Sequence, residues 1–308
     1  MDRASLSSRR GLWFIMGAAT LWGTTGVVTQ AVYDLRPTNA LSITFLRLGI
    51  AALVLLLLCW RRLGRRLWQV KRRDALLMLC MGAMQATSQY CYFAAIANSG
   101  VTIATMVTIC LAPVMVVLLA ALFLREQVTG RILLALLGAL VGTALLTGAP
   151  SGQRPFGSLL VGVLLSLISA ATYAMVILLA RVLSGRYHSL QVNVASFASG
   201  ALLLLGCSLL TTPLVLSYPA VGWLLLFYMG VVPTALAYML FQVGLRSTPA
   251  TLTSILTFCE PLTAAILAWL LFGERLSLLG LLGAALLLGT MLLLALAQPA
   301  PVAAQASE

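Results

Sequence analysis

The chain consists of long apolar runs separated by short polar breaks. Each run is about as long as a helix that crosses the hydrocarbon core of a bilayer, which takes about 20 residues. The pattern predicts ten transmembrane helices, over residues 11–32, 38–60, 74–97, 100–124, 129–148, 157–180, 190–211, 219–244, 249–272 and 277–297. We therefore expect an all-α polytopic membrane protein.

The composition supports this fold class. Hydrophobic residues make up 61% of the chain and charged residues 8%, whereas soluble domains carry about 25% charged residues. A water-soluble core of this composition would leave almost no polar residues for the surface.

Two segments of the chain, 98–129 and 246–277, align without a gap at a separation of 148 residues. The matched pairs are Ser99 and Ser247, Thr105 and Thr253, Pro113 and Pro261, and Glu126 and Glu274. One copy lies late in each half of the chain, so we expect two repeats of five helices. Because five is odd, the second repeat crosses the membrane in the opposite sense. Inverted repeats usually place a transporter's binding site at their interface.

The repeats divide the chain into a short N-terminal segment, two membrane units, a linker and a tail. We expect a cytoplasmic segment over 1–10, a first repeat over 11–148 and an external linker over 149–156. The second repeat then covers 157–297, and a disordered cytoplasmic tail covers 298–308.

Basic residues lie mostly on one side of the predicted helices. With both termini cytoplasmic, the outer loops hold only Arg36, Arg154 and Arg275. The cytoplasmic segments then hold Arg3, Arg9, Arg10, Arg61, Arg62, Arg65, Arg66, Lys71, Arg72, Arg73, Arg125, Arg131, Arg181, Arg186 and Arg246. The positive-inside bias favours this orientation. The net charge of +12 thus flanks the membrane, where it meets anionic lipids, and does not indicate a nucleic-acid partner.

No motif in the sequence indicates a metal, a cofactor or an enzyme. The six cysteines lie singly within apolar runs, without the spacing of a metal site. The sequence has no phosphate-binding Gly-x-x-x-x-Gly-Lys loop, so we do not expect direct ATP hydrolysis. It also has no paired carboxylates within a span and no nucleophile–base spacing.

Tyrosines and cysteines apart, Arg47 and Glu260 are the only ionisable residues deep within the predicted spans. A charge at that depth costs at least about 2.5–3.5 kcal/mol on insertion scales, so it usually faces a partner or a polar cavity. Two interpretations remain open. The two residues form one structural ion pair, or Arg47 receives an anionic substrate group while Glu260 carries a proton or receives an amine. Glu260 aligns with Ala112 in the other repeat, so helix packing alone does not require a glutamate there.

Further polar residues lie in the third and eighth spans, which are equivalent in the two repeats. The candidates for substrate binding are Gln85, Gln89 and Tyr90 in the third span and Tyr238 and Gln242 in the eighth, together with Trp22 in the first. Amide and phenol groups in hydrocarbon need partners or water. Helix-to-helix hydrogen bonds and the lining of a cavity both satisfy this requirement.

Four residues of the aligned segments are expected to be structural. Glu126 and Glu274 lie in turns, three residues before the candidate N-caps Thr129 and Ser277. A carboxylate beside the positive end of the following helix is favourable. Pro113 and Pro261, like Pro233 in the eighth span, each remove a backbone hydrogen bond from the middle of a helix.

Several motifs in order resemble the ten-helix EamA-type branch of the drug/metabolite transporter superfamily, over about residues 11–297. They are Leu21-Trp22-Gly23, Phe45-Leu46-Arg47 and the two Pro…Glu units. The resemblance implies a gradient-driven carrier of amino acids or other small metabolites, often an exporter, in the cell inner membrane. One departure is Thr172-Tyr173 in the sixth span, where the family often repeats its tryptophan.

We therefore expect a secondary active transporter that works by alternating access and uses Glu260 for proton coupling. Its expected partners are a small-molecule substrate and membrane lipids, and its expected state is a monomer or a homodimer. Two alternatives are a flippase for a lipid-linked substrate and a non-transporting membrane scaffold.

Overall fold

The computed structural model describes residues 3–64, 69–99, 101–147, 156–272 and 278–296. Helices are the only regular elements in these ranges. The first predicted repeat contains α1 (Arg3–Leu35), α2 (Ala40–Leu63), α3 (Arg72–Ser99), α4 (Val101–Leu124) and α5 (Gly130–Thr147). The second contains α6 (Phe156–Ser184), α7 (Ser189–Leu210), α8 (Ala220–Gly230), the π-helix η2 (Val231–Leu236), α9 (Ala237–Gly244), α10 (Ala250–Leu256), α11 (Cys259–Phe272) and α12 (Leu278–Leu296).

Among the described residues, six helical segments are long and apolar enough to cross a membrane, over Arg10–Leu35, Ala40–Leu63, Val107–Leu124, Gly157–Ser184, Ser189–Leu210 and Ala220–Gly244. Gly130–Leu145 and Leu278–Thr290 are shorter apolar helices. The predicted all-α membrane class is thus confirmed. Glu274, Ser277, the tail 298–308 and nearly all of the linker 149–156 lie outside the described residues.

The surface is apolar and the interior holds polar side chains. Leu122, Leu209 and Leu210 are 72%, 82% and 88% exposed, whereas Arg47, Gln85 and Gln242 are buried. A soluble protein distributes these residue types in the opposite way. This distribution fits a protein whose outer surface contacts lipid.

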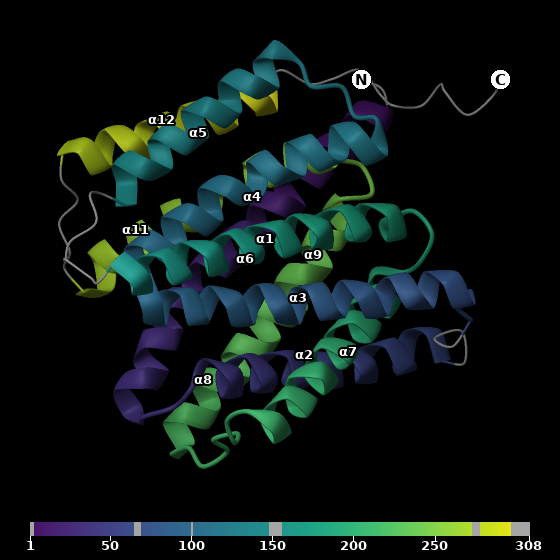
Figure 1. Ribbon diagram of the computed structural model, residues 1–308. Coiled ribbons are helices and arrows are strands. Elements are labelled where there is room, and N and C mark those ends of the chain that lie inside the picture. Colours follow the sequence, from purple (N-terminus) through teal and green to yellow (C-terminus); the bar gives the residue numbers. More distant parts are fainter. Residues whose placement is uncertain (1–2, 65–68, 100, 148–155, 273–277, 297–308) are drawn as a thin grey trace.

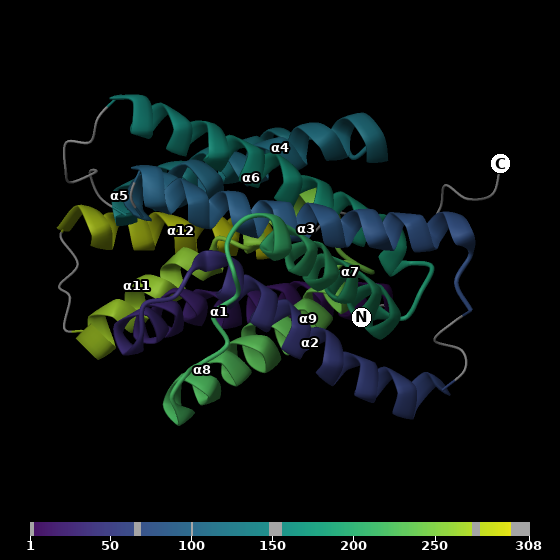
Figure 2. The same ribbon diagram turned by 60° about the horizontal axis from the view of Figure 1, so that its bottom comes forward.

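The first helix of each predicted repeat packs within the other repeat. Helix α1 packs against α9 and α11, and α6 packs against α3 and α4. Helix α2 lies against α7, and α5 lies against α12 along one edge of the bundle (Figure 1). The same neighbours are visible after rotation of the molecule (Figure 2). The two halves of the chain are therefore interleaved.

Glycines allow several of these helices to approach closely. A Cβ on Gly82 of α3 would overlap the Ser196 carbonyl of α7, and one on Gly200 would lie 2.9 Å from the Gly82 carbonyl oxygen. A Cβ on Gly23 of α1 would lie 2.7 Å from the Glu260 carbonyl oxygen. The small residues thus hold α3 against α7 and bring α1 beside α11.

The three mid-span prolines have different effects on their helices. Pro113 lies within α4, which is assigned without interruption, and Pro233 lies within η2. Pro261 lies in the first turn of α11, after a turn at 257–258 that separates α11 from α10. The predicted ninth span is therefore two helices and not one. Pro261 lacks the N–H that would donate to the Thr257 carbonyl, and the N–H of Glu260 donates to that carbonyl instead, at 2.9 Å.

Glu126 stabilises a helix end, although not the one expected from its position in the chain. Its two carboxylate oxygens accept the backbone N–H groups of Ala250 and Thr251 at 2.8 and 3.0 Å. These N–H groups belong to the first two residues of α10, which lies in the other half of the chain. The next helix in sequence, α5, has Thr129 at its start, where the hydroxyl accepts the N–H of Ile132 at 3.4 Å.

The same end of the bundle, where α2 ends and α3 begins, carries a polar cluster on the turn between α6 and α7. Arg186 pairs with Asp74 at 2.9 Å, and the Tyr187 hydroxyl donates to the same carboxylate at 2.8 Å. We call this end of the bundle the basic end, since it includes the exposed Arg61, Arg62, Arg72 and Arg73.

His188 caps α7 at the basic end. Its Nδ1 accepts the N–H of Leu190, and the Gln191 side chain accepts the N–H of His188. Partial desolvation and the nearby charges of Arg246 and Arg62 lower the pKa of His188. The imidazole is therefore neutral at neutral pH, as an Nδ1 acceptor requires.

We predict that Gly82→Ala lowers the melting temperature of the detergent-solubilised protein. The added Cβ meets the α7 backbone, so α3 and α7 must move apart, at a cost of about 1–3 kcal/mol. Gly206→Ala in α7 is the control, because a Cβ there meets nothing within 4 Å. Alanine favours a helix over glycine, so the control should not lose stability. Equal losses would contradict the close crossing.

We predict that Glu126→Gln exposes the start of α10. The amide keeps one acceptor oxygen and loses the negative charge beside the helix N-terminus, which costs about 1 kcal/mol. Hydrogen exchange measured by mass spectrometry should become faster at Ala250 and Thr251. Faster exchange at the start of α5, with α10 unchanged, would instead support the role expected from the sequence.

Candidate functional site

Arg47 lies in the interior of the bundle and is 7% exposed. It belongs to α2, and its Nε donates to the Thr234 hydroxyl of η2 at 2.7 Å. This is its only hydrogen bond to the described residues. The terminal nitrogens Nη1 and Nη2 therefore have no protein partner within the described part of the chain. A guanidinium with two free donor groups is suited to a planar oxyanion.

Glu260 lies in the first turn of α11 and is partly exposed. Three features position it: the turn at 257–258 begins α11 in the middle of the span, Pro261 follows, and Gly23 lets α1 approach the Glu260 carbonyl. A carboxylate is favourable in the first turn of a helix, near the positive end of the helix dipole.

Arg47 and Glu260 attract each other but do not form an ion pair. Their charges interact electrostatically, yet the described residues contain just one ion pair within 4.0 Å, between Arg186 and Asp74. The structural ion pair between Arg47 and Glu260, one of the two interpretations left open by the sequence, is thus not formed in this structure. Both charged groups keep capacity for another partner.

Two tyrosines complete a cluster around these charges. Tyr173 of α6 and Tyr238 of α9 lie within electrostatic range of each other, of Arg47 and of Glu260. We call Arg47, Tyr173, Tyr238 and Glu260 the central cluster. Its members come from α2, α6, α9 and α11. Helices α9 and α11 pack with α1, whereas α6 packs with α3 and α4; we call these two sets of helices the packing groups.

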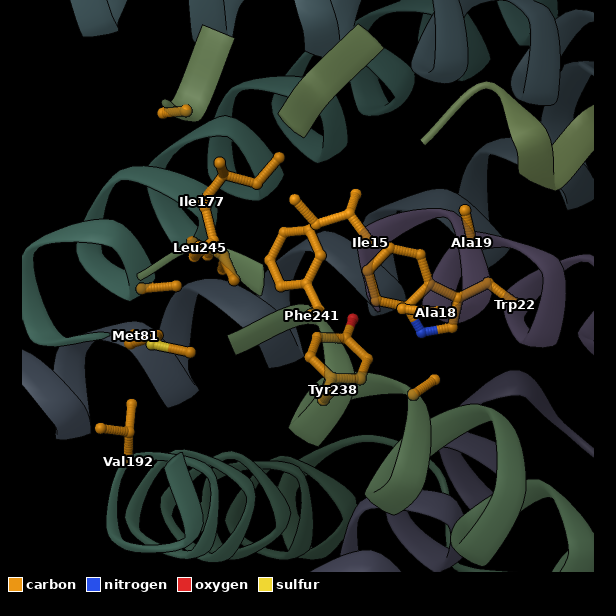
Figure 3. Packing of buried hydrophobic residues seen from close by; sticks show 14 of the residues in the cluster. Ile15, Ala18, Ala19, Trp22, Met81, Ile177, Val192, Tyr238, Phe241 and Leu245 are labelled. Carbon is orange, nitrogen blue, oxygen red and sulfur yellow. The ribbon is translucent and has the colours of Figure 1, made fainter. Parts of the chain in front are cut away.

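The rings of Trp22 and Phe241 pack around Tyr238 of the central cluster (Figure 3). The centroid of the Trp22 ring lies 4.9 Å from that of Tyr238 and 5.1 Å from that of Phe241. Phe197 meets Tyr238 edge-on at 5.1 Å. The indole Nε1 of Trp22 is buried without a hydrogen-bond partner in the described structure. Trp22 therefore both packs in the core and holds a free donor near the cluster.

The predicted polar residues of α3 and α9 join helices. Gln85 Nε2 donates to the Tyr238 hydroxyl at 2.7 Å, and Gln242 Nε2 donates to the Ala180 carbonyl at 2.8 Å. The Oε1 atom of Gln85 is buried without a partner among the described residues. Gln85 and Gln242 thus serve as helix-to-helix links, and Gln85 also retains one free acceptor.

These links continue from the central cluster to the basic end. Further polar contacts connect the end of α9 and the start of α10 with α6 and the α4–α5 loop. They join Arg181 to the Leu245 carbonyl, Arg246 to the Tyr187 carbonyl at 3.1 Å, and Glu126 to the N–H groups of Ala250 and Thr251. We call the series from Gln85–Tyr238 to Glu126–Thr251 the basic-end ladder.

The structure does not bring every predicted residue into the central cluster. Gln89 lies one helical turn beyond Gln85 on the same side of α3 and is partly exposed. Tyr90 is 44% exposed and lies about 100° around the helix from Gln89. Gln89 is thus placed toward the same side as Gln85, whereas Tyr90 points elsewhere.

Two residues of the site were missed in the sequence. Tyr173 lies in the sixth span at about the position where the family resemblance led us to expect a tryptophan, and that departure was a usable signal. Thr234 follows Pro233, but a single threonine in an apolar span carries no signal of its own. Within the described residues, no group of three or more His, Cys, Asp or Glu is placed to hold a metal.

Comparison with known proteins gives the same family for both halves of the chain. The model of the EamA-like transporter family matches twice, over residues 9–148 and 160–296. An uncharacterized transporter of Archaeoglobus fulgidus is 31% identical over 92% of this chain and 96% of its own. The uncharacterized inner membrane transporter YicL of Salmonella typhimurium is 30% identical over 94% and 96%.

A solved structure shares the fold. It superimposes with a TM-score of 0.79 over 92% of this chain and 95% of its own, at 20% sequence identity. The family resemblance noted in the sequence is confirmed by these matches. The chain belongs to the EamA-like transporter family, and it is a multi-pass membrane transporter.

Proposed function

We propose that this protein is a secondary active transporter that exports a small metabolite with a carboxylate and an ammonium group, such as an amino acid. Arg47 binds the carboxylate, and Glu260 binds the ammonium group or a proton. The proposal rests on the opposite charges of Arg47 and Glu260, which attract each other within the bundle but form no ion pair and so remain able to bind a ligand.

The charge of the central cluster favours this class of substrate. A single buried guanidinium balances one negative charge, and the nearby Glu260 carboxylate repels a second one. A dianion such as a phosphate monoester is therefore a poor match. A zwitterion pairs its carboxylate with Arg47 and its ammonium group with Glu260, so that none of the four charges is left without a partner.

The packing supports alternating access. The polar links between α9–α10 and the group α3, α4 and α6 form the basic-end ladder, which runs from the central cluster to one end. Helix α10 packs against α4, whereas α11, the other half of the same span, packs against α1. We infer that the structure is closed at the basic end, and that the site reaches the opposite side in this state.

Interleaved packing also supports two inverted five-helix repeats. If each helix is replaced by its equivalent in the other half, the contacts of α6 with α3 and α4 become those of α1 with α9 and α11. The contacts α2–α7 and α5–α12 are each converted into themselves. The two matches to one family unit agree with this symmetry. Rocking of the two packing groups would then expose the site to each side in turn.

The basic end faces the cytoplasm in our proposal, with both termini on that side, because arginines concentrate there. The inner-membrane location follows the charge bias and the name of the Salmonella relative. Export follows the family resemblance. A proton and the substrate ammonium group compete for Glu260, so one site binds them alternately and exchanges them across the membrane.

We predict that Arg47→Gln abolishes discrimination between a carboxylate and its amide. Purified protein is screened by thermal unfolding against the twenty amino acids and their carboxamides. A compound at a hundred times its dissociation constant stabilises the protein by about 2.7 kcal/mol. In the wild type, the best amino acid should bind about tenfold or more tightly than its amide, because a charged hydrogen bond is lost. Discrimination that survives in Arg47→Gln would refute carboxylate binding by this residue.

We predict that Glu260→Gln removes the pH dependence of binding. In the wild type, affinity for that amino acid should fall as the pH is lowered, since a protonated carboxyl no longer attracts the ammonium group. The variant should bind about tenfold more weakly at high pH, with the same affinity across the pH range. Asp34→Asn is the control, because Asp34 lies exposed at the end of α1 and should leave the pH profile unchanged. A normal profile in Glu260→Gln would exclude Glu260 as the proton site.

A further inference from the structure

A short chain of hydrogen bonds connects α2 to the π-helix η2. Arg47 Nε donates to Thr234 Oγ1 at 2.7 Å, and Thr234 Oγ1 donates to the Met229 carbonyl at 2.7 Å. The direction is unambiguous, since a guanidinium only donates and a carbonyl only accepts. Thr234 is fully buried, so water does not compete for these bonds.

The Thr234 hydroxyl replaces a donor that the backbone lacks. In a regular α-helix, the N–H of residue 233 would donate to the carbonyl of Met229. Proline has no N–H, and the Thr234 side chain donates to this carbonyl instead. Backbone hydrogen bonding also shifts locally to the π pattern, in which the N–H of Ala237 donates to the Val232 carbonyl. The hydroxyl proton of Thr234 is thereby committed, so its oxygen faces Arg47 as an acceptor.

This acceptor determines how the guanidinium is presented. The group is planar and carries its five N–H donors in a rigid fork. The bond at Nε restrains the plane of the group and leaves Nη1 and Nη2 free of protein partners among the described residues. Tyr173, Tyr238 and Glu260 are the electrostatic neighbours of Arg47. Two parallel N–H groups, one on Nη1 and one on Nη2, match the two oxygens of a carboxylate.

We propose that Thr234 is a positioning residue that orients Arg47 for end-on, two-bond recognition of a substrate carboxylate. The inference rests on the proposed function, in which Arg47 binds that carboxylate. Thr234 itself does not touch the substrate. Its contribution is to hold Nε, so that the guanidinium does not rotate and offer Nε and one Nη in a different direction.

The test compares Thr234→Val with Thr234→Ser. Valine keeps the branched shape of threonine and removes both hydrogen bonds, whereas serine keeps the hydroxyl. The probe is the amino acid that binds most tightly in the panel above, measured beside its carboxamide. Thr234→Val should reduce the preference for the acid over the amide by about tenfold. Thr234→Ser should keep the preference within about threefold of the wild type.

A double-mutant cycle separates positioning from a general loss of structure. If Thr234 acts through Arg47, Thr234→Val should not change the acid-to-amide preference further in an Arg47→Gln background. A merely structural defect would lower the binding of acid and amide alike in both backgrounds. That result would overturn the inference, as would an unchanged preference in Thr234→Val. The melting temperature of each variant shows that the compared proteins are folded.

The outcomes distinguish the positioning role of Thr234 from carboxylate binding by Arg47. If Arg47→Gln loses the preference and Thr234→Val keeps it, the positioning role is wrong and carboxylate binding by Arg47 stands. If no amino acid in the panel is preferred over its amide by the wild type, the proposed function and the positioning role are both wrong.

Discussion

Backbone groups inside this bundle need partners from the protein itself, because a bilayer offers no water to an unpaired backbone carbonyl. The constraint acts most strongly at Pro233 and Pro261, where the backbone loses an N–H. At Pro233, Thr234 supplies the missing donor and thereby binds Arg47. At Pro261, the helix ends and begins again, which places Glu260 in a first turn. The two irregular segments thus create the two halves of the central cluster.

The same constraint explains why hydrophobicity located the spans well and the contacts poorly. The long apolar runs predicted the helices, and the polar breaks between them predicted the ends of α2, α4 and α7 closely. The break at 257–258 lies in a run whose scattered threonines and serine resemble those of other spans, so composition did not reveal it. Pro261 was a signal for it, but Pro113, at the equivalent position, lies in an uninterrupted helix. A proline removes a hydrogen bond in both cases, and the surrounding packing decides whether the helix breaks.

The candidate site was predicted as far as charge allows. Arg47 and Glu260 were found because an ionisable residue deep in an apolar span is costly and therefore informative. Tyr173 and Thr234 were missed because their importance comes from neighbours more than 60 residues away in the chain. The true partner of Glu126 was missed for the same reason, since α10 follows α5 in sequence only after the whole of α6 to α9.

The two repeats differ in the residues that they contribute to the central cluster. A symmetric pair of packing groups has no preferred charge at its centre. In this chain, the ninth span carries Glu260 where the fourth carries Ala112, and Thr234 and Pro233 modify the eighth. Helices α8 to α11 therefore hold the acid, the irregular backbone and one side of the basic-end ladder, while α3, α4 and α6 supply the other side. Movement of α9 and α10 relative to α6 would then alter the ladder and the surroundings of Tyr238 together, because Gln85 of α3 bonds to Tyr238 of α9 and Gln242 of α9 bonds to the Ala180 carbonyl of α6. In the proposed mechanism, a bound zwitterion would pair with both Arg47 and Glu260, and this would change the free-energy cost of separating the helices that carry them. In this proposal, binding and opening would be coupled through charge.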